Sequence, residues 1–177
     1  KKIKSLKIGN PEDKDTDIGP LSKKEFVENI NNQVDKSIVL GSEIIFKASN
    51  NNLKGFFMVP IVLVSKNLDV PIFQEEVFGP VVSIYIFNNN DDILKIVNDT
   101  DYGLGASLWT KNSQIIDTFK KNIDTGALFI NGMTKSDPRV PFGGIKKSGY
   151  GRELSIDGIK EFINIKTIVM QKDGVIN

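Results

Sequence analysis

Gln74-Glu75-Glu76-Val77-Phe78-Gly79-Pro80 stands before a β-type run, Val81 to Phe87. Proline fixes its own φ, and a glycine in front of it is free to take backbone angles closed to other residues. The stretch therefore predicts a rigid bend with carboxylates at its mouth, leading into a strand that is apolar enough to be buried on both faces. From these residues alone, a surface turn with solvated acids is the better interpretation.

A second stretch, Pro141 to Glu153, reads Pro-Phe-Gly-Gly-Ile-Lys-Lys-Ser-Gly-Tyr-Gly-Arg-Glu. Together with Glu75 to Pro80 it resembles the C-terminal part of the NAD(P)-dependent aldehyde dehydrogenases. Asn98 to Thr110 also fits that family, as does Gly9-Asn10-Pro11 with Ile18-Gly19-Pro20-Leu21 behind it. Four ordered motifs at compatible spacing are far more specific than a lone glycine fingerprint. The resemblance covers nearly the whole chain.

The composition limits the kinds of partner that the chain could bind. The 177 residues carry a formal net charge of +1, with 40% hydrophobic and 25% charged residues. Such a balance gives no electrostatic case for nucleic acid or an anionic membrane, and the longest apolar run, Val59 to Val64, is far shorter than a membrane span. No signal-peptide pattern opens the chain, so we expect a cytoplasmic protein with neither nucleic-acid nor membrane partners.

The chain contains no cysteine and no histidine. Disulfides, thiolate zinc sites and catalysis by either side chain are thereby excluded, and we expect neither a metal site nor a catalytic residue here. The resemblance implies a cysteine nucleophile upstream of Gly9-Asn10-Pro11. We therefore expect a C-terminal fragment that begins after the nucleophile and is inactive alone. A complete but inactive paralogue is the less favoured alternative.

Periodicity predicts a helix from Leu21 to the glycine at position 41, begun by a capping box of Ser22 and Glu25. Strands at 43–48 and 55–64 follow as a hairpin that could lie outside the main sheet, with Pro60 marking a break. From residue 81 the predicted order is strand, helix, strand, helix, strand, at 81–87, from 91, 105–110, from 112 or 113, and 126–131. Such alternation indicates an α/β fold with a parallel sheet.

The rest of the chain is predicted to be a long loop, 132–152, then a short helix capped by Ser155 and a final strand over 163–171. The resemblance implies that residues 1–162 are part of an aldehyde dehydrogenase catalytic domain and 163–177 an oligomerisation strand and tail. We accordingly expect a homo-oligomer formed through that strand.

Glu76 is the first candidate site residue. Its carboxylate can accept hydrogen bonds from two vicinal hydroxyls, which suits a ribose. The resemblance implies that Glu76 holds the nicotinamide ribose of NAD or NADP and that Phe78 contacts the cofactor. The alternative is a surface acid and a core aromatic, and Glu75 is expected to be structural or solvated. The adenine and phosphate elements of a dinucleotide fold are absent from the sequence.

Phe142 and Ser136 are the candidate substrate-binding residues. An aromatic beside two glycines at a loop tip can wall an apolar slot, and the resemblance implies that Phe142 lines the substrate entrance; packing the loop onto the core is an equal alternative. The stretch 136–155 most resembles succinate-semialdehyde dehydrogenases, in which the serine at the place of Ser136 helps to bind the distal carboxylate. Arg139 is a tempting partner for that carboxylate, although a solvent-facing arginine is the better interpretation.

Two functions of different class follow. In the first, the chain is part of an enzyme that oxidises a small aldehyde, succinate semialdehyde, to the acid with NAD or NADP. In the second, it is a non-enzymatic module that associates through its terminal strand. Lys146, Ser148, Arg152 and Glu153 are predicted to tie the glycine-rich loop down, and Asn131 to serve turn chemistry.

Overall fold

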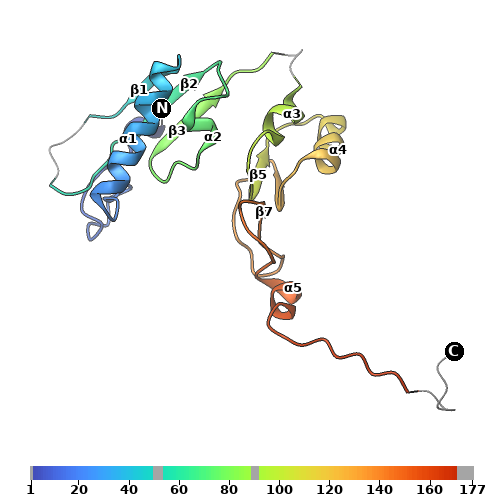
Figure 1. Ribbon diagram of the computed structural model, residues 1–177. Coiled ribbons are helices and arrows are strands. Elements are labelled where there is room, and N and C mark those ends of the chain that lie inside the picture. Colours follow the sequence, from blue (N-terminus) through green and yellow to red (C-terminus); the bar gives the residue numbers. More distant parts are fainter. Residues whose placement is uncertain (1, 50–53, 89–91, 171–177) are drawn as a thin grey trace. The chain divides into compact units, whose positions relative to one another are not determined.

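The computed structural model describes residues 2–49, 54–88 and 92–170. The chain divides into two compact units, residues 1–91 and 92–177. Each is an assembly of short helices and strands (Figure 1). Within the described residues, no helix is both long and apolar enough to cross a membrane.

A three-stranded sheet forms the centre of the first unit. Its strands are β1 (Glu43–Lys47), β2 (Ile61–Ser65) and β3 (Val81–Tyr85), in the order β1-β2-β3. β1 and β2 are antiparallel and β2 and β3 are parallel. The β1–β2 pair does not lie outside the sheet, as the sequence had left open, because β2 pairs with β3 along its whole length. β2 begins directly after Pro60, whose missing N–H ends the ladder there.

Helix α1 (Lys24–Val39) packs its apolar stripe onto this unit. Of the apolar residues spaced by four along the helix, Ile30 and Val34 are each 3% exposed, as the spacing predicts, whereas Phe26 and Ile38 are 39% and 38% exposed. The capping box is wrong, because the N-cap is Lys23 and no side chain caps the helix. The C-terminal prediction is confirmed: Gly41 takes φ +98°, the left-handed conformation in which glycine commonly ends a helix.

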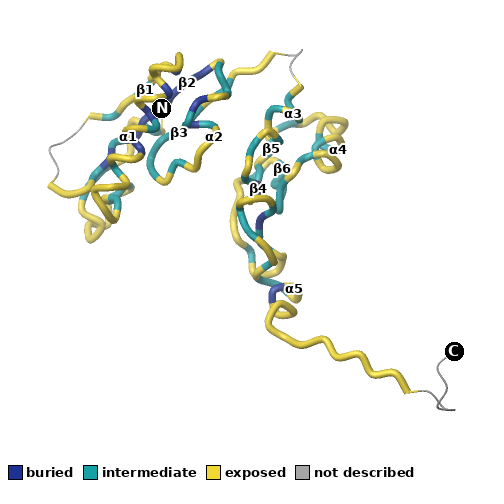
Figure 2. Tube along the Cα trace, in the orientation of Figure 1, coloured by how far each residue is buried: buried dark blue, intermediate teal, exposed yellow. Residues whose placement is uncertain are grey.

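The core of the first unit gathers between α1, the sheet and the short helix α2 (Pro71–Gln74). Figure 2 shows this unit holding most of the buried chain. Its buried apolar side chains are Ile30, Val34, Met58, Ile61, Leu63, Val70 and Ile72. Gly79 lies close to this core: a Cβ at that position would be 2.5 Å from Cδ1 of Ile30. Gly79 does not take the left-handed backbone angle, and its nearest neighbour is the tip of the Ile30 side chain.

β3 is not buried on both faces. Its residues alternate between half-buried and exposed, and Val82 is 52% exposed. The apolar run was read as a fully buried strand, but the helices of this unit cover one face only. The N-terminal segment adds a 3-10 turn, η1 (Lys2–Ser5), and an isolated bridge between Ile8 and Ile18.

The second unit contains the predicted alternation. Helix α3 (Ile93–Asn98) is capped by Asp92, and helix α4 (Ser113–Asn122) by Asn112. Strands β5 (Gly105–Leu108) and β6 (Ala127–Ile130) flank α4 and pair in parallel. The predicted strand–helix–strand order is confirmed here. The prediction of one parallel sheet is not, because among the described residues β3 pairs with β2, which is antiparallel to β1, and β5 and β6 form a separate two-stranded sheet.

The long loop predicted after residue 131 is anchored by a short antiparallel ladder. Strand β7 (Ile145–Lys146) lies within the loop and pairs with β4 (Tyr102–Gly103). Helix α5 (Ser155–Lys160) follows, but its N-cap is Leu154 and the Ser155 hydroxyl accepts only from the amide of Asp157 at 3.4 Å. Apolar side chains in this unit are at most half-buried in its described part; the residues that are buried are glycines 103, 144 and 158.

Residues 163–170 run on as an extended segment (Figure 1). The segment is in no ladder with another described strand, and Ile165 and Met170 are 82% and 91% exposed. The strand predicted over 163–171 is therefore not formed in residues 163–170, because no described strand pairs with them; residue 171 and the predicted tail lie outside the described residues.

Candidate cofactor and substrate sites

The bend before β3 holds Glu76 in place from two sides. The amide of Glu75 donates to the carbonyl of Pro71 at 2.9 Å, and that of Gly79 to Val77 at 3.0 Å. From α1, Nε2 of Gln33 donates to the Glu75 carboxylate at 2.8 Å and to the Glu76 carbonyl at 3.3 Å. Glu75, predicted to be structural or solvated, is exposed and hydrogen-bonded to Gln33, and it helps to fix the backbone on which Glu76 stands.

The side chains of Glu76 and Phe78 point to a shallow concavity of about 460 Å³. Glu76 is exposed, and its carboxylate accepts no hydrogen bond from another described residue; Phe78 is 71% exposed. The wall is mostly apolar and comes from α1 and the segment before it: Leu21, Ser22, Phe26, Asn29, Ile30 and Gln33. A free carboxylate on a fixed backbone, beside an open aromatic face, fits a ribose and the flat ring that it carries.

The glycine-rich loop of the second unit places Phe142 at the start of a backbone pair. Phe142 and Glu153 exchange both amide hydrogen bonds at 2.8 Å. The ring is half-buried and lines a concavity of about 390 Å³ together with Leu104, Tyr150 and Phe162. Partial burial agrees with both interpretations of Phe142, since the ring packs against the loop and still faces an open hollow.

Three polar side chains tie this loop down, as predicted. Lys146 donates to the carbonyls of Asn98 and Thr100, the Ser148 hydroxyl accepts from the amide of Gly103 at 3.0 Å, and Nη1 of Arg152 donates to the carbonyls of Gly144 and Gly151. Glu153 contributes through its backbone. No buried ion pair between Arg152 and Glu153 is found in the described part of the chain.

Ser136 and Arg139 lie on the approach to this loop. Ser136 is exposed. The Arg139 guanidinium donates two hydrogen bonds to the Asp137 carboxylate, from Nε to Oδ1 at 2.9 Å and from Nη2 to Oδ2 at 2.6 Å. These bonds hold the pKa of Asp137 well below its usual range and raise the pKa of Arg139. The guanidinium fork is thus already occupied by a carboxylate, which favours a structural role for Arg139 over a direct grip on substrate.

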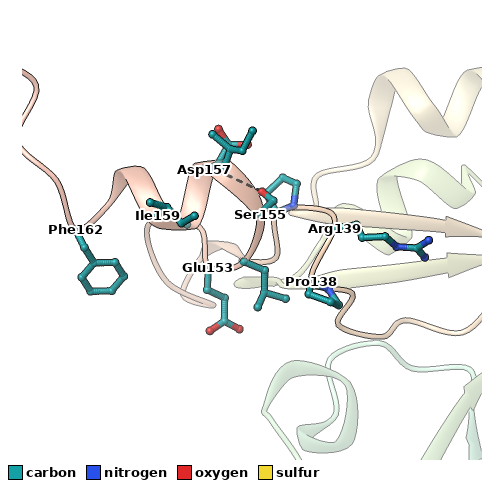
Figure 3. A pocket seen from close by; sticks show the side chains of 11 residues that line it. Pro138, Arg139, Glu153, Ser155, Asp157, Ile159 and Phe162 are labelled. Atoms are coloured by element: carbon teal, nitrogen blue, oxygen red, sulfur yellow. Dashed lines mark hydrogen bonds between the residues drawn. The ribbon is translucent and has the colours of Figure 1, made fainter.

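Arg139 also borders the open hollow drawn in Figure 3, of about 850 Å³. Its wall is formed by α5, the residues on either side of it and the earlier stretch 138–141, and includes Pro138, Ile159 and Phe162. The one hydrogen bond in the view joins Ser155 and Asp157. Few polar groups converge on the hollow, so its chemistry is that of an apolar contact surface.

Asn131 serves the turn chemistry expected of it. Its side-chain Nδ2 donates to the carbonyl of Thr110, and its Oδ1 accepts from the amide of the same residue, both at 3.0 Å. The side-chain amide of Asn131 therefore extends the hydrogen bonding between β5 and β6 by one step beyond Ile130. The described residues hold no cluster of three or more acidic side chains arranged to bind a metal ion.

The predicted site residues fall into two pairs. Glu76 and Phe78 share the concavity of the first unit, and Phe142 and Ser136 belong to the loop of the second. Sequence reasoning missed Gln33, the residue that holds the bend. Nothing in the sequence marks it, because its partners stand 42 and 43 positions away.

Comparison with known proteins gives a consistent result. The sequence profile of the aldehyde dehydrogenase family matches residues 1–168. Succinate-semialdehyde dehydrogenase (NADP+) from Mycobacterium leprae is 44% identical over 167 residues, which cover 94% of this chain and 36% of the relative. A probable succinate-semialdehyde dehydrogenase (NADP+) from Synechocystis is 41% identical over 168 residues, covering 95% of this chain and 37% of the relative.

Solved structures agree. Succinic semialdehyde dehydrogenase from Streptococcus pyogenes, in complex with NADP+, superposes with a TM-score of 0.87 at 34% identity, over 95% of this chain and 37% of that one. An aldehyde dehydrogenase from Mycobacterium tuberculosis, complexed with NAD+, gives 0.88 at 32% identity, over 98% and 36%. The chain thus spans just over a third of the length of the relatives that it matches.

Proposed function

The chain belongs to the aldehyde dehydrogenase family, and from that premise we propose that it is the C-terminal part of an enzyme that oxidises an aldehyde to the carboxylic acid with NAD or NADP. The nucleophile is then a cysteine thiolate outside these 177 residues, because the chain contains none. In this view residues 1–162 belong to the catalytic domain and 163–177 form the oligomerisation strand and tail.

The observation that carries the proposal is the state of Glu76. Its backbone carbonyl is held by Gln33, while its carboxylate has no partner in the described part of the chain. A fixed but unpaired carboxylate is suited to accept two hydroxyl hydrogen bonds at once. Glu76 would hold the nicotinamide ribose, and the exposed ring of Phe78 would contact the nicotinamide side of the cofactor.

The chemistry divides between the cofactor and the protein. When bound, the nicotinamide supplies the hydride acceptor. The residues of this chain would orient the cofactor and enclose the substrate. Glu76 would fix the ribose, Phe78 would limit tilting of the nicotinamide ring, and Phe142 would line the entrance for the aldehyde. Orientation of this kind lowers the barrier because the reacting atoms are already aligned.

Succinate semialdehyde is the proposed substrate. Two observations support it: the relatives named above include succinate-semialdehyde dehydrogenases at 41 to 44% identity, and the exposed hydroxyl of Ser136 precedes Phe142 in the same loop. Ser136 would donate to the distal carboxylate of the substrate. Arg139 is not assigned this role, because it is bound to Asp137.

The exposed terminal segment favours a homo-oligomer. Residues 163–170 are extended and unpaired within the described part of the chain, and they expose the apolar side chains of Ile163, Ile165, Ile168, Val169 and Met170. An unpaired edge is a template for another strand. We propose that this segment pairs with a sheet of a second copy. The same segment supports the alternative of a purely associating module, which predicts no effect of Glu76 on catalysis.

The test is Glu76→Gln in the complete protein, with Glu75→Gln as the matched control. Both remove one charge from the same turn, but only Glu76 is assigned to the ribose. Charge-assisted hydrogen bonds contribute about 1.5–3 kcal/mol, so the single-turnover rate of NADH or NADPH formation should fall by about tenfold or more in Glu76→Gln. Glu75→Gln weakens the Gln33 contact that supports the turn and so measures what that loss costs by itself. A single-turnover rate in Glu76→Gln equal to that of the parent protein would refute the role of Glu76.

A further inference from the structure

Lys146 has an unusual backbone for a residue with a side chain. Its φ is +55°, the left-handed region that favours glycine, and it holds this angle at the end of strand β7. The flanking motif is rich in glycine, yet a lysine occupies this position. A residue kept in a sparsely populated conformation points to a constraint imposed by its surroundings or its function.

The Lys146 ammonium provides that constraint. Nζ donates to the carbonyl of Asn98 at 2.9 Å and to that of Thr100 at 3.1 Å, and it lies 3.8 Å from the Asp124 carboxylate. Asn98 is the last residue of α3, where carbonyls without helical partners attract a cation. The side chain is only 28% exposed, so most of its length is enclosed.

The groups that meet the ammonium are themselves fixed. The side chain of Asn98 donates to the carbonyl of Asn122 at 2.8 Å and accepts from the amide of Asp124 at 2.9 Å. This joins the end of α3 to the end of α4 and to the turn before β6. Lys146 therefore anchors the glycine-rich loop to a rigid junction of three elements.

The anchor lies four residues from Phe142, and the backbone between them has little freedom. β7 pairs with β4, and Ser148 accepts from the amide of Gly103. The carbonyl of Gly143 lies against Gly126, where a Cβ would come within 1.8 Å of it. We therefore expect a shift of β7 to reach the Phe142–Glu153 backbone pair.

We propose that Lys146 is a positioning residue: through its ammonium it clamps the glycine-rich loop to the α3–β4 turn and so sets the place of Phe142 at the substrate entrance. The second half of this statement rests on the proposed function. The clamp itself does not, because it concerns only contacts within residues 98–153. The side chain of Lys147, its neighbour, reaches the same turn only through an exposed ion pair with Asp101, and exposed ion pairs contribute little.

The experiment compares Lys146→Met, Lys146→Arg and Lys147→Met in the complete protein. Hydrogen–deuterium exchange is followed in the peptide that contains Phe142 and Glu153. Loss of the clamp should speed exchange there about tenfold in Lys146→Met, with partial recovery in Lys146→Arg and no change in Lys147→Met. Lys146→Gly is the second variant, because glycine accepts the left-handed backbone and preserves folding while still removing the ammonium. It should exchange as fast as Lys146→Met.

Kinetics separate the clamp from the role of Phe142. If Phe142 walls the entrance, Phe142→Ala raises KM for succinate semialdehyde, and Lys146→Met should raise it in the same direction with a smaller change in kcat. An unchanged KM in Phe142→Ala would count against the proposed function and leave exchange as the criterion for the clamp. Exchange in both Lys146→Met and Lys146→Gly equal to that of Lys147→Met would overturn the proposal.

Discussion

Replacement of Gly126 by alanine tests the packing of the second unit directly. The added Cβ would lie 1.8 Å from the carbonyl oxygen of Gly143, 2.8 Å from its carbon and 3.1 Å from Cα of Gly144. All three are backbone atoms, so no rotamer change relieves the clash. Non-bonded heavy atoms reach their optimum at about 3.5 Å or more. The loop must therefore retreat by about 1.5 Å.

That retreat breaks contacts which hold the loop. The amide of Gly126 donates to Gly103 at 2.9 Å, and the amide of Lys147 to Asp101 at 2.8 Å. Overpacking in a well-packed site costs about 1–3 kcal/mol. A clash between two backbone segments belongs at the upper end of this range, because neither can be relieved by a rotamer change. With a urea dependence of about 2 kcal/mol/M, a loss of about 3 kcal/mol lowers the unfolding midpoint by about 1.5 M.

The assay is urea unfolding of the chain followed by tryptophan fluorescence. Trp109 is the single tryptophan and directly follows β5, so its emission reports on the second unit. Gly132→Ala is the matched control, because the nearest atom to its Cβ would be the Ile130 carbonyl oxygen at 4.0 Å; surface changes of this kind stay within about 0.5 kcal/mol. Equal midpoints for the two variants would show that the loop yields without cost and that the reasoning is wrong.

Three further outcomes are expected. The 177-residue chain should form no NADH or NADPH from succinate semialdehyde, because it contains no cysteine; turnover above a no-protein control would contradict this. It should associate through its terminal segment, so that light scattering with size-exclusion chromatography finds dimers or larger species, and deletion of 164–177 shifts it toward monomer or insoluble aggregate; a clean monomer of the intact chain at high concentration would disprove this. Because Arg139 lowers the pKa of Asp137, the stabilisation from this pair is complete above the unfolded pKa of about 3.9 and is lost as the pH falls below it toward the folded value. Carbon NMR titration of Asp137 should show a midpoint that rises to an ordinary value in Arg139→Met, and an unchanged midpoint would exclude the pair as its cause.

Local rules in the sequence predicted much of the second unit. The starts of α3 and α4 depend on residues a few positions apart, and the parallel β5–β6 pair follows from the strand–helix–strand order. The same rules failed at Ser22 and Glu25, because α1 begins at Lys24 and no side chain caps it. A capping box is a pattern of residue types, and it places a helix start only where the backbone angles follow.

Features set by distant residues were out of reach. Gly79 does not take the special backbone angle that the sequence suggests, and it packs against the side chain of Ile30, 49 positions earlier. β3 was expected to be buried on both faces, because apolar content alone does not say how many layers cover a strand. The candidate site was located by its motifs, but the support of Glu76 by Gln33 and of the loop by Asn98 and Thr100 is tertiary.

The contacts divide the residues of the two motifs into scaffold and site. Glu75, Lys146, Ser148 and Arg152 are each hydrogen-bonded within their own unit, and the glycines at 143 and 144 pack where a Cβ would clash. A side chain already engaged in this way would have to break its own contacts before it could bind a ligand, which costs free energy. Glu76 and Phe78 need to break no contact of this kind. Both side chains are exposed, and the Glu76 carboxylate has no hydrogen-bond partner among the described residues. The motif around Glu76 therefore contains both residues that hold the backbone and residues that are free to bind. The Glu76 carboxylate is the group best placed to bind a hydroxylated ligand.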